Sequence, residues 1–162
     1  MQVFAGNYQE KSFANIATNE PRTLKPGLGW MEHLEVEFEP RCDTGPVPER
    51  ARSLFDELLS AMEEYGLSMR VNSPAVMQGL RAAGFVDIKQ EVFDMPLSEW
   101  TDDEERNEIG RYFNLALTQT MEEFLLCPLA RIKRRTVQEI HDASYEAKKD
   151  IFNKACRLYM KV

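Results

Sequence analysis

The stretch from Leu24 to Glu39 constrains the fold of this chain most strongly. Its Pro-Gly pair at positions 26 and 27 is typical of a turn, and the residues after Gly29 alternate along the chain. Alternate residues of a β-strand point to opposite faces of the sheet. We therefore predict a strand over 30–39 with one mainly apolar face and one charged face. The first face holds Trp30, Glu32, Leu34, Val36 and Phe38, and the second holds Met31, His33, Glu35, Glu37 and Glu39.

Four segments show the apolar spacing of amphipathic helices. They run from Pro48 to Gly66, from Ser73 to Gly84, from Thr101 to the residue before Pro128, and from Thr136 to about Ile151. Thr followed three residues later by Glu is typical of a capping box, and it supports the starts at Thr101 and Thr136. A short fifth helix is expected around 13–17.

Two further segments, 85–93 and 156–162, alternate as strands do, and residues 1–4 would end another strand. The length suits a single domain over 1–162 with one core. The sequence thus predicts an α/β fold, a small mixed sheet with four or five helices.

Several motifs occur in an order that is typical of a known family. They are Lys25-Pro26-Gly27 with Gly29-Trp30, then Asp43-Thr44-Gly45, Ala83-Gly84-Phe85, Pro96-Leu97 with Trp100, and Gly110 with Asn114. In these motifs the chain resembles the C-terminal half of a class I S-adenosylmethionine-dependent methyltransferase, in particular the fungal LaeA-like group of secondary metabolism. The resemblance implies a truncated Rossmann-like fold in which the last strand inserts antiparallel beside the strand at 30–39.

Such folds hold their cofactor with a glycine-rich loop that follows a strand and opens a helix. Nothing before residue 24 has this pattern, and the Gly27 and Gly29 pair precedes a strand instead. We therefore expect the chain alone to bind no cofactor, and S-adenosylmethionine to bind only if a partner completes the site. Whether Met1 is the natural start, or the sequence an incomplete gene model, is left open.

The charged face of the first strand supplies the candidate catalytic residues, His33, Glu35 and Glu37. The resemblance implies that residues at and after the C-terminal end of this strand face the substrate, where a carboxylate or imidazole acts as a general base. The alternative is a solvated strand face.

Candidate substrate-binding residues are Trp100, Tyr112, Phe113 and Met121. Trp100 lies in the family motif before the long helix, where it would belong to a lid over the substrate. The other three could line an apolar pocket. The alternative for all four is packing, because an apolar stripe at helical spacing usually belongs to the core.

Composition excludes several functions. The formal net charge of −7 argues against general nucleic-acid binding. Three scattered cysteines and two separated histidines give no metal-binding spacing, and no apolar run reaches membrane-spanning length. We expect a cytoplasmic protein, with the basic run Arg131–Arg135 leaving a nuclear location open.

Three functions remain. The first is a methyltransferase-family protein of fungal secondary-metabolite biosynthesis that acts on a small hydrophobic metabolite. The second is a pseudo-enzyme or partner subunit that forms a homodimer, or pairs with an intact methyltransferase, through an exposed sheet edge. The third is a cofactor-independent cyclase or isomerase built on the remnant fold.

Overall fold

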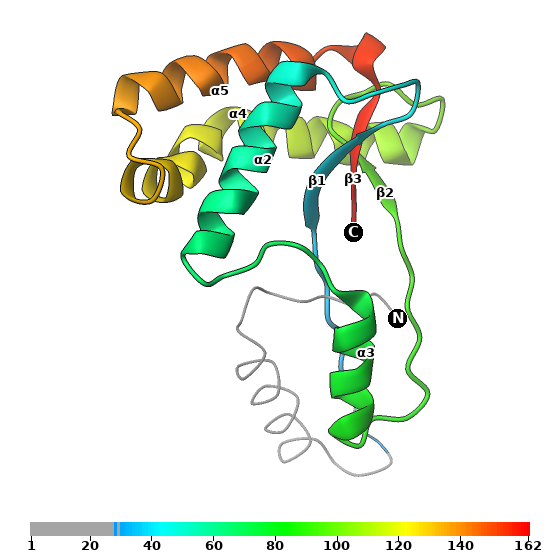
Figure 1. The fold of residues 1–162 in the computed structure, drawn as a ribbon. Coiled ribbons are helices and arrows are strands. Elements are labelled where there is room, and N and C mark those ends of the chain that lie inside the picture. Colours follow the sequence, from blue (N-terminus) through cyan, green and yellow to red (C-terminus); the bar gives the residue numbers. More distant parts are fainter. Residues whose placement is uncertain (1–27, 29) are drawn as a thin grey trace.

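The computed structural model describes residue 28 and residues 30–162. These residues form β1 (Glu37–Cys42), α2 (Glu49–Glu64), α3 (Ser73–Ala82), β2 (Asp94–Pro96), α4 (Glu104–Arg131), α5 (Val137–Ile151), a short 3-10 helix (Lys154–Cys156) and β3 (Leu158–Lys161) (Figure 1). The strand expected at 1–4, the helix around 13–17 and the Pro-Gly turn lie outside the described residues.

The sheet has the order β1-β3-β2, with β3 antiparallel to both neighbours. The last strand therefore inserts antiparallel beside β1, as expected. The expectation of a mixed sheet is wrong for the described residues, because both pairings are antiparallel. Pro40 lies within β1, where the register shifts between Glu37 and Arg41. A proline cannot donate to the ladder, so it is tolerated at such an irregularity in an edge strand.

Two predicted strands are shorter than their alternation suggested. The strand expected at 30–39 begins only at Glu37, and the one expected at 85–93 is replaced by β2, which begins at Asp94. Both begin opposite Lys161, where β3 ends. Before Glu37 and Asp94, the described residues contain no further strand that continues the line of β3. Alternation in the sequence is therefore not sufficient to form a paired strand.

The helices at 48–66, 73–84 and 136–151 are confirmed as α2, α3 and α5. The Thr136 capping box forms with Glu139 as predicted. In α3 the cap is Asn72 instead of Ser73, because the Asn72 side chain accepts a hydrogen bond from the backbone N–H of Ala75 at 3.1 Å.

Helix α4 differs from its prediction at both ends. It is capped by Asp103 instead of Thr101, since the Asp103 carboxylate accepts the backbone N–H of Arg106 at 2.9 Å. It also continues through Pro128 to Arg131. Proline removes one helical hydrogen bond, but Pro128 and Leu129 are buried in the core, which favours the continued helix.

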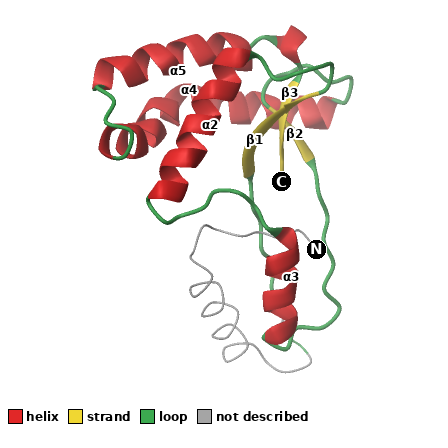
Figure 2. Cartoon of the chain, viewed as in Figure 1, coloured by secondary structure: helices red, strands yellow, loops and turns green. Residues whose placement is uncertain are grey.

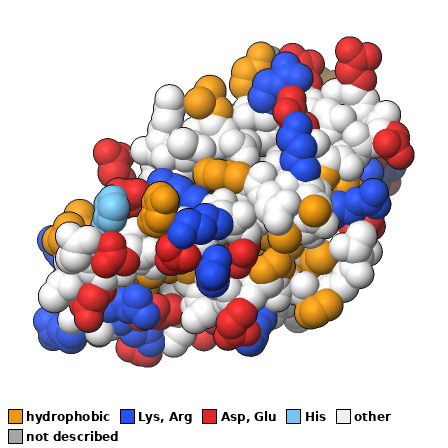
Figure 3. Space-filling model, turned by 90° about the horizontal axis from the view of Figure 1, so that it is seen from above, with side chains coloured by type: hydrophobic (Ala, Val, Ile, Leu, Met, Phe, Trp, Pro, Cys, Tyr) orange, Lys and Arg blue, Asp and Glu red, His pale blue; other side chains and the backbone are white. Residues whose placement is uncertain are grey.

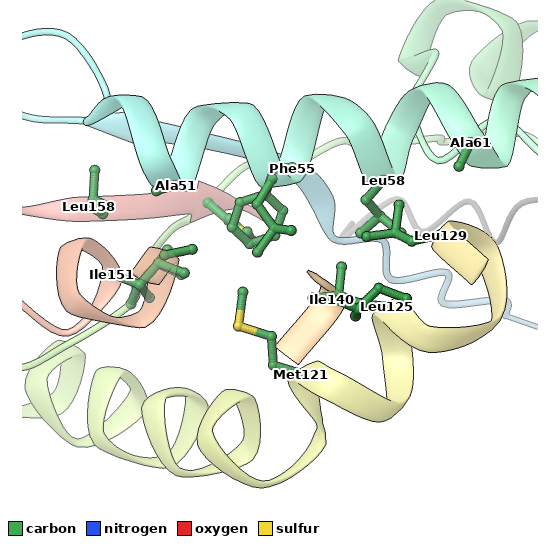
Figure 4. Packing of buried hydrophobic residues seen from close by; sticks show 14 residues of the cluster. Ala51, Phe55, Leu58, Ala61, Met121, Leu125, Leu129, Ile140, Ile151 and Leu158 are labelled. Carbon is green, nitrogen blue, oxygen red and sulfur yellow. The ribbon is translucent and has the colours of Figure 1, made fainter. Parts of the chain in front are cut away.

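One core lies between α2, α4, α5 and the sheet, with α2 on one side and α4 on the other (Figure 4). Fully burying a leucine contributes about 1.5–3 kcal/mol, so this cluster supplies most of the stability of the described fold. Its largest apolar members are Leu54, Phe55, Leu58, Leu97, Met121, Leu125, Leu129, Ile140, Ile151, Leu158 and Met160.

Helix α3 lies apart from the other helices, beyond the end of the sheet (Figure 2). It buries Val76 and Leu80 in a separate small cluster, against which Met31, Phe85 and Ile88 pack. The two extended segments before β1 and β2 thus both rest on α3.

The segment between β2 and α4 is held tightly to the body of the protein. The indole N–H of Trp100 donates to the carbonyl of Leu158 at 2.8 Å, and the Asn114 amide donates to the carbonyl of Leu97 at 3.2 Å. Gly110 of α4 faces this segment so closely that an added Cβ would lie 2.7 Å from the Ser98 carbonyl oxygen. These contacts give the motif residues Trp100, Gly110 and Asn114 a structural role.

Acidic and basic side chains are interspersed on the face seen from above the sheet (Figure 3). In the loop after α2, Arg70 joins two elements by pairing with Glu39 of β1 and with Glu63 of α2. Within residues 30–162, no helix is long and apolar enough to span a bilayer.

Candidate functional site

Two adjoining clefts lie where β1 and β2 begin. The larger, of about 1230 Å³, runs between residues 30–33 and 85–91, with Leu80 of α3 on its wall. The smaller, of about 250 Å³, lies at the end of β3 and is lined by Lys161 and Val162 together with residues of both extended segments. Glu91 lines both clefts, so the two adjoin at this residue.

Two of the predicted catalytic residues lie half-buried in these clefts. His33 lines the larger cleft and Glu35 the smaller. Burial lowers the pKa of His33 to about 4 and raises the pKa of Glu35 to about 7. At neutral pH the imidazole is therefore uncharged and the carboxyl group about half protonated. Both states are suited to proton exchange with a bound molecule.

Glu37 lies in the smaller cleft but is held by an ion pair. Its carboxylate accepts a hydrogen bond from the guanidinium of Arg41 at 2.7 Å, and its backbone is paired with Lys161 of β3. The structure thus brings the three predicted residues to one region, with Glu37 in a structural contact. Arg41, Glu91 and Lys161 were missed, although the alternating charges of 85–93 were a signal for Glu91.

These residues lie at the opposite end of the strand from the position that the resemblance implies. His33 and Glu35 precede β1, and Glu37 is its first residue. The other end of β1 leads into the loop 43–48, where Arg157 pairs with Asp43 at 3.4 Å and the Cys42 thiol donates to the carbonyl of Cys156 at 3.0 Å. The prediction placed them wrongly along the strand because it began the strand too early.

The four predicted substrate-binding residues do not line either cleft. Met121 is 3% exposed in the core, Phe113 packs against the core, and Trp100 is hydrogen-bonded to β3. Tyr112 is 64% exposed on α4. The structure brings none of the four together with His33.

The described residues do not fit S-adenosylmethionine. Two connections in the described residues lead from a strand to a helix, residues 43–48 between β1 and α2 and residues 97–103 between β2 and α4. The first contains one glycine, Gly45, and the second contains none. Neither has the paired glycines that let backbone N–H groups approach a ligand. In the same residues, no cluster of three or more His, Cys, Asp or Glu side chains could hold a metal ion.

No protein-family model matches the chain, and no solved structure matches it. Curated relatives do match. The chain is 35% identical to the "Secondary metabolism regulator LAE1" of Pyricularia oryzae and 32% identical to the "Protein-methionine methyltransferase laeA" of Chaetomium globosum. Each of these two matches covers 85% of this chain and 44% of the relative.

A third relative, the "Secondary metabolism regulator laeA" of Aspergillus fumigatus, is 31% identical over 98% of this chain and 42% of the relative. The chain therefore spans less than half the length of the curated relatives it matches. Over most of its length the chain is homologous to proteins of the LaeA-like methyltransferase group.

Proposed function

We propose that this chain is a methyltransferase-related component of fungal secondary metabolism that works together with a second polypeptide region, which supplies the S-adenosylmethionine site. The homology to regulators of secondary metabolism and to a protein named as a methyltransferase supports this role. The proposed methyl acceptor of the completed assembly is a small hydrophobic metabolite.

The observation that carries the proposal is the position of β1. In the described residues β1 is an edge strand, paired with β3 on one side only. All its residues are partly buried and none is fully buried. An edge strand presents unpaired backbone groups to another chain, and in the proposed assembly a second copy or an intact methyltransferase pairs with it.

Light scattering over a range of protein concentrations, with and without an intact LaeA-like methyltransferase, tests this role. We expect a homodimer, or a stoichiometric complex with the methyltransferase that transfers labelled methyl groups. A monomer at every concentration that also leaves the added methyltransferase unbound would contradict the proposal.

A second candidate function, cofactor-independent proton transfer as in an isomerase or cyclase, is favoured by the half-buried Glu35 in the smaller cleft. The pKa of about 7 for Glu35 suits an acid or base at neutral pH. Glu35→Gln should then abolish turnover of a pathway intermediate without cofactor. Unchanged turnover in this variant would rule out Glu35 as the proton-transferring group.

A further inference from the structure

The ends of β1 and β3 bring two cysteines together. Cys42 is the last residue of β1 and is paired with Leu158, the first residue of β3. The ladder continues for one more hydrogen bond, from the backbone N–H of Asp43 to the carbonyl of Arg157 at 3.2 Å. Cys156 ends the 3-10 helix immediately before Arg157. The strand pairing therefore places Cys156 beside Cys42, although the two are 114 residues apart in the sequence.

The side chain of Cys42 is directed at the backbone of Cys156. Its thiol donates a hydrogen bond to the Cys156 carbonyl oxygen at 3.0 Å. Arg157, the next residue, has the left-handed conformation with φ 43°, so the chain at this point departs from the extended line of β3. To form a disulfide, the Cys42 sulfur has to exchange the carbonyl oxygen for the Sγ atom of the same residue. This exchange requires side-chain rotation and a small adjustment of the backbone.

The surroundings of the two thiols suit a reactive pair. Each cysteine is partly exposed, so a small oxidant can reach it. Thr44 places its hydroxyl oxygen 3.6 Å from the Cys42 sulfur, and this hydroxyl can donate a hydrogen bond to a thiolate. The pKa of the Cys156 thiol is raised by burial and, to a smaller extent, by the charges of Asp150 and Cys42. The Cys42 sulfur therefore lies within electrostatic reach of the Cys156 sulfur.

We propose that Cys42 and Cys156 form an oxidative modification site, at which hydrogen peroxide converts the two thiols to a disulfide. In the first step the Cys42 thiolate attacks one peroxide oxygen and the O–O bond breaks. The hydroxide that leaves takes up the thiol proton to form water, and Cys42 becomes a sulfenic acid. In the second step the Cys156 thiolate attacks this sulfur, the S–O bond breaks, and the hydroxide takes up the Cys156 proton to form a second water. The two thiols lose two electrons, and the peroxide is reduced to water.

The disulfide fastens one end of an edge strand. In the described residues β1 is paired with β3 alone. In the reduced protein its end at Cys42 is held by the thiol hydrogen bond and by the ion pair of Arg157 with Asp43 at 3.4 Å. Oxidation replaces the hydrogen bond with a covalent link between the end of β1 and the start of β3. In a reducing compartment such a link is transient and responds to oxidants, and this inference does not depend on methyl transfer.

The test is a peptide map of the full chain after oxidation. The reduced protein is treated with hydrogen peroxide, the remaining thiols are alkylated, and a non-reducing tryptic digest is analysed by mass spectrometry. Trypsin releases Cys42 in peptide 42–50, Cys156 in peptide 155–157 and Cys127 in peptide 112–131. We expect 42–50 joined to 155–157 with the loss of the two thiol hydrogens. Alkylated thiols in both peptides, or 42–50 joined as often to 112–131 as to 155–157, would overturn the proposal.

Urea unfolding gives a second readout, because a disulfide that closes a long loop restricts the unfolded chain. The oxidised protein should unfold at about 1–2 M more urea than the reduced protein, and dithiothreitol should reverse this shift. Cys127→Ser should keep the link and the shift, whereas Cys156→Ser should stop at the sulfenic acid of Cys42, which dimedone traps. A shift that persists in Cys156→Ser, or that is lost in Cys127→Ser, would contradict the assignment. If Cys156→Ser does not fold, the peptide map of the parent decides alone.

Discussion

Replacing Gly110 by alanine tests whether the segment before α4 is held as tightly as its contacts indicate. The added Cβ would lie 2.7 Å from the backbone oxygen of Ser98, 3.1 Å from its carbonyl carbon and 3.2 Å from Cβ of Pro96. Two of these neighbours are backbone atoms, so no side-chain rotation relieves the contact. The helix or the segment must shift.

The magnitude follows from two opposing terms. Overpacking of this kind costs about 1–3 kcal/mol, and the hydrogen bonds that Trp100 and Asn114 make at either end of the Ser98 turn resist its movement. Alanine gains about 1 kcal/mol over glycine in a helix interior. Because the contact is with fixed backbone, we place its cost at the upper end and expect a net loss of about 1–2 kcal/mol in the free energy of unfolding.

Urea unfolding followed by circular dichroism measures this loss, and Gly45→Ala is the matched control. A Cβ at Gly45 would meet no atom within 4 Å, so this change should be neutral or slightly stabilising. A Gly110→Ala protein as stable as the parent, or more stable, would refute the tight contact between α4 and the segment at Ser98.

Three further predictions concern other contacts. Trp100→Phe should lower the free energy of unfolding by about 0.5–1.5 kcal/mol, because it removes one of the two donors to the carbonyl of Leu158, which keeps the backbone N–H of Leu97; a loss within error in urea unfolding would show that this bond adds nothing. Thr136→Ala should cost about 1 kcal/mol by removing the capping box with Glu139, and full thermal stability in this variant would contradict the cap. Glu35 binds its proton more tightly in the folded protein, with a pKa of about 7 against the usual 4.5, so its contribution to stability is present below pH 4.5 and is lost as pH rises through 7. In the Glu35→Gln variant the free energy of unfolding should therefore decrease less between about pH 5 and pH 8 than in the parent. Denaturant titrations at both pH values measure this decrease, and an unchanged pH dependence would refute the raised pKa of Glu35.

Local signals in the sequence were sufficient to predict most of the helices. The apolar stripe of α2 and the capping box at Thr136 act within a few residues, so both could be predicted without knowledge of the fold. Pro128 was misread as a helix stop because its burial depends on the packing of α4 against the core. The cost of a proline in a helix is local, whereas the burial that offsets it is not.

The strands and the site were harder to predict for one shared reason. The paired part of a strand ends where its partner strand ends. β3 ends opposite Glu37, and the alternation of residues 30–39 does not reveal this end. His33 and Glu35 line the two clefts, but the prediction assigned them to a ladder that does not reach them. The walls of the larger cleft come from two segments far apart in sequence, and only the fold brings them together.

Isothermal titration of the folded chain with S-adenosylmethionine tests the central claim most directly. The account predicts no stoichiometric binding to the chain alone, because the described residues provide no paired glycines where β1 leads into α2. It also predicts that binding appears only in a complex with a second polypeptide region. Stoichiometric binding at micromolar affinity to the isolated, monomeric chain would contradict the account.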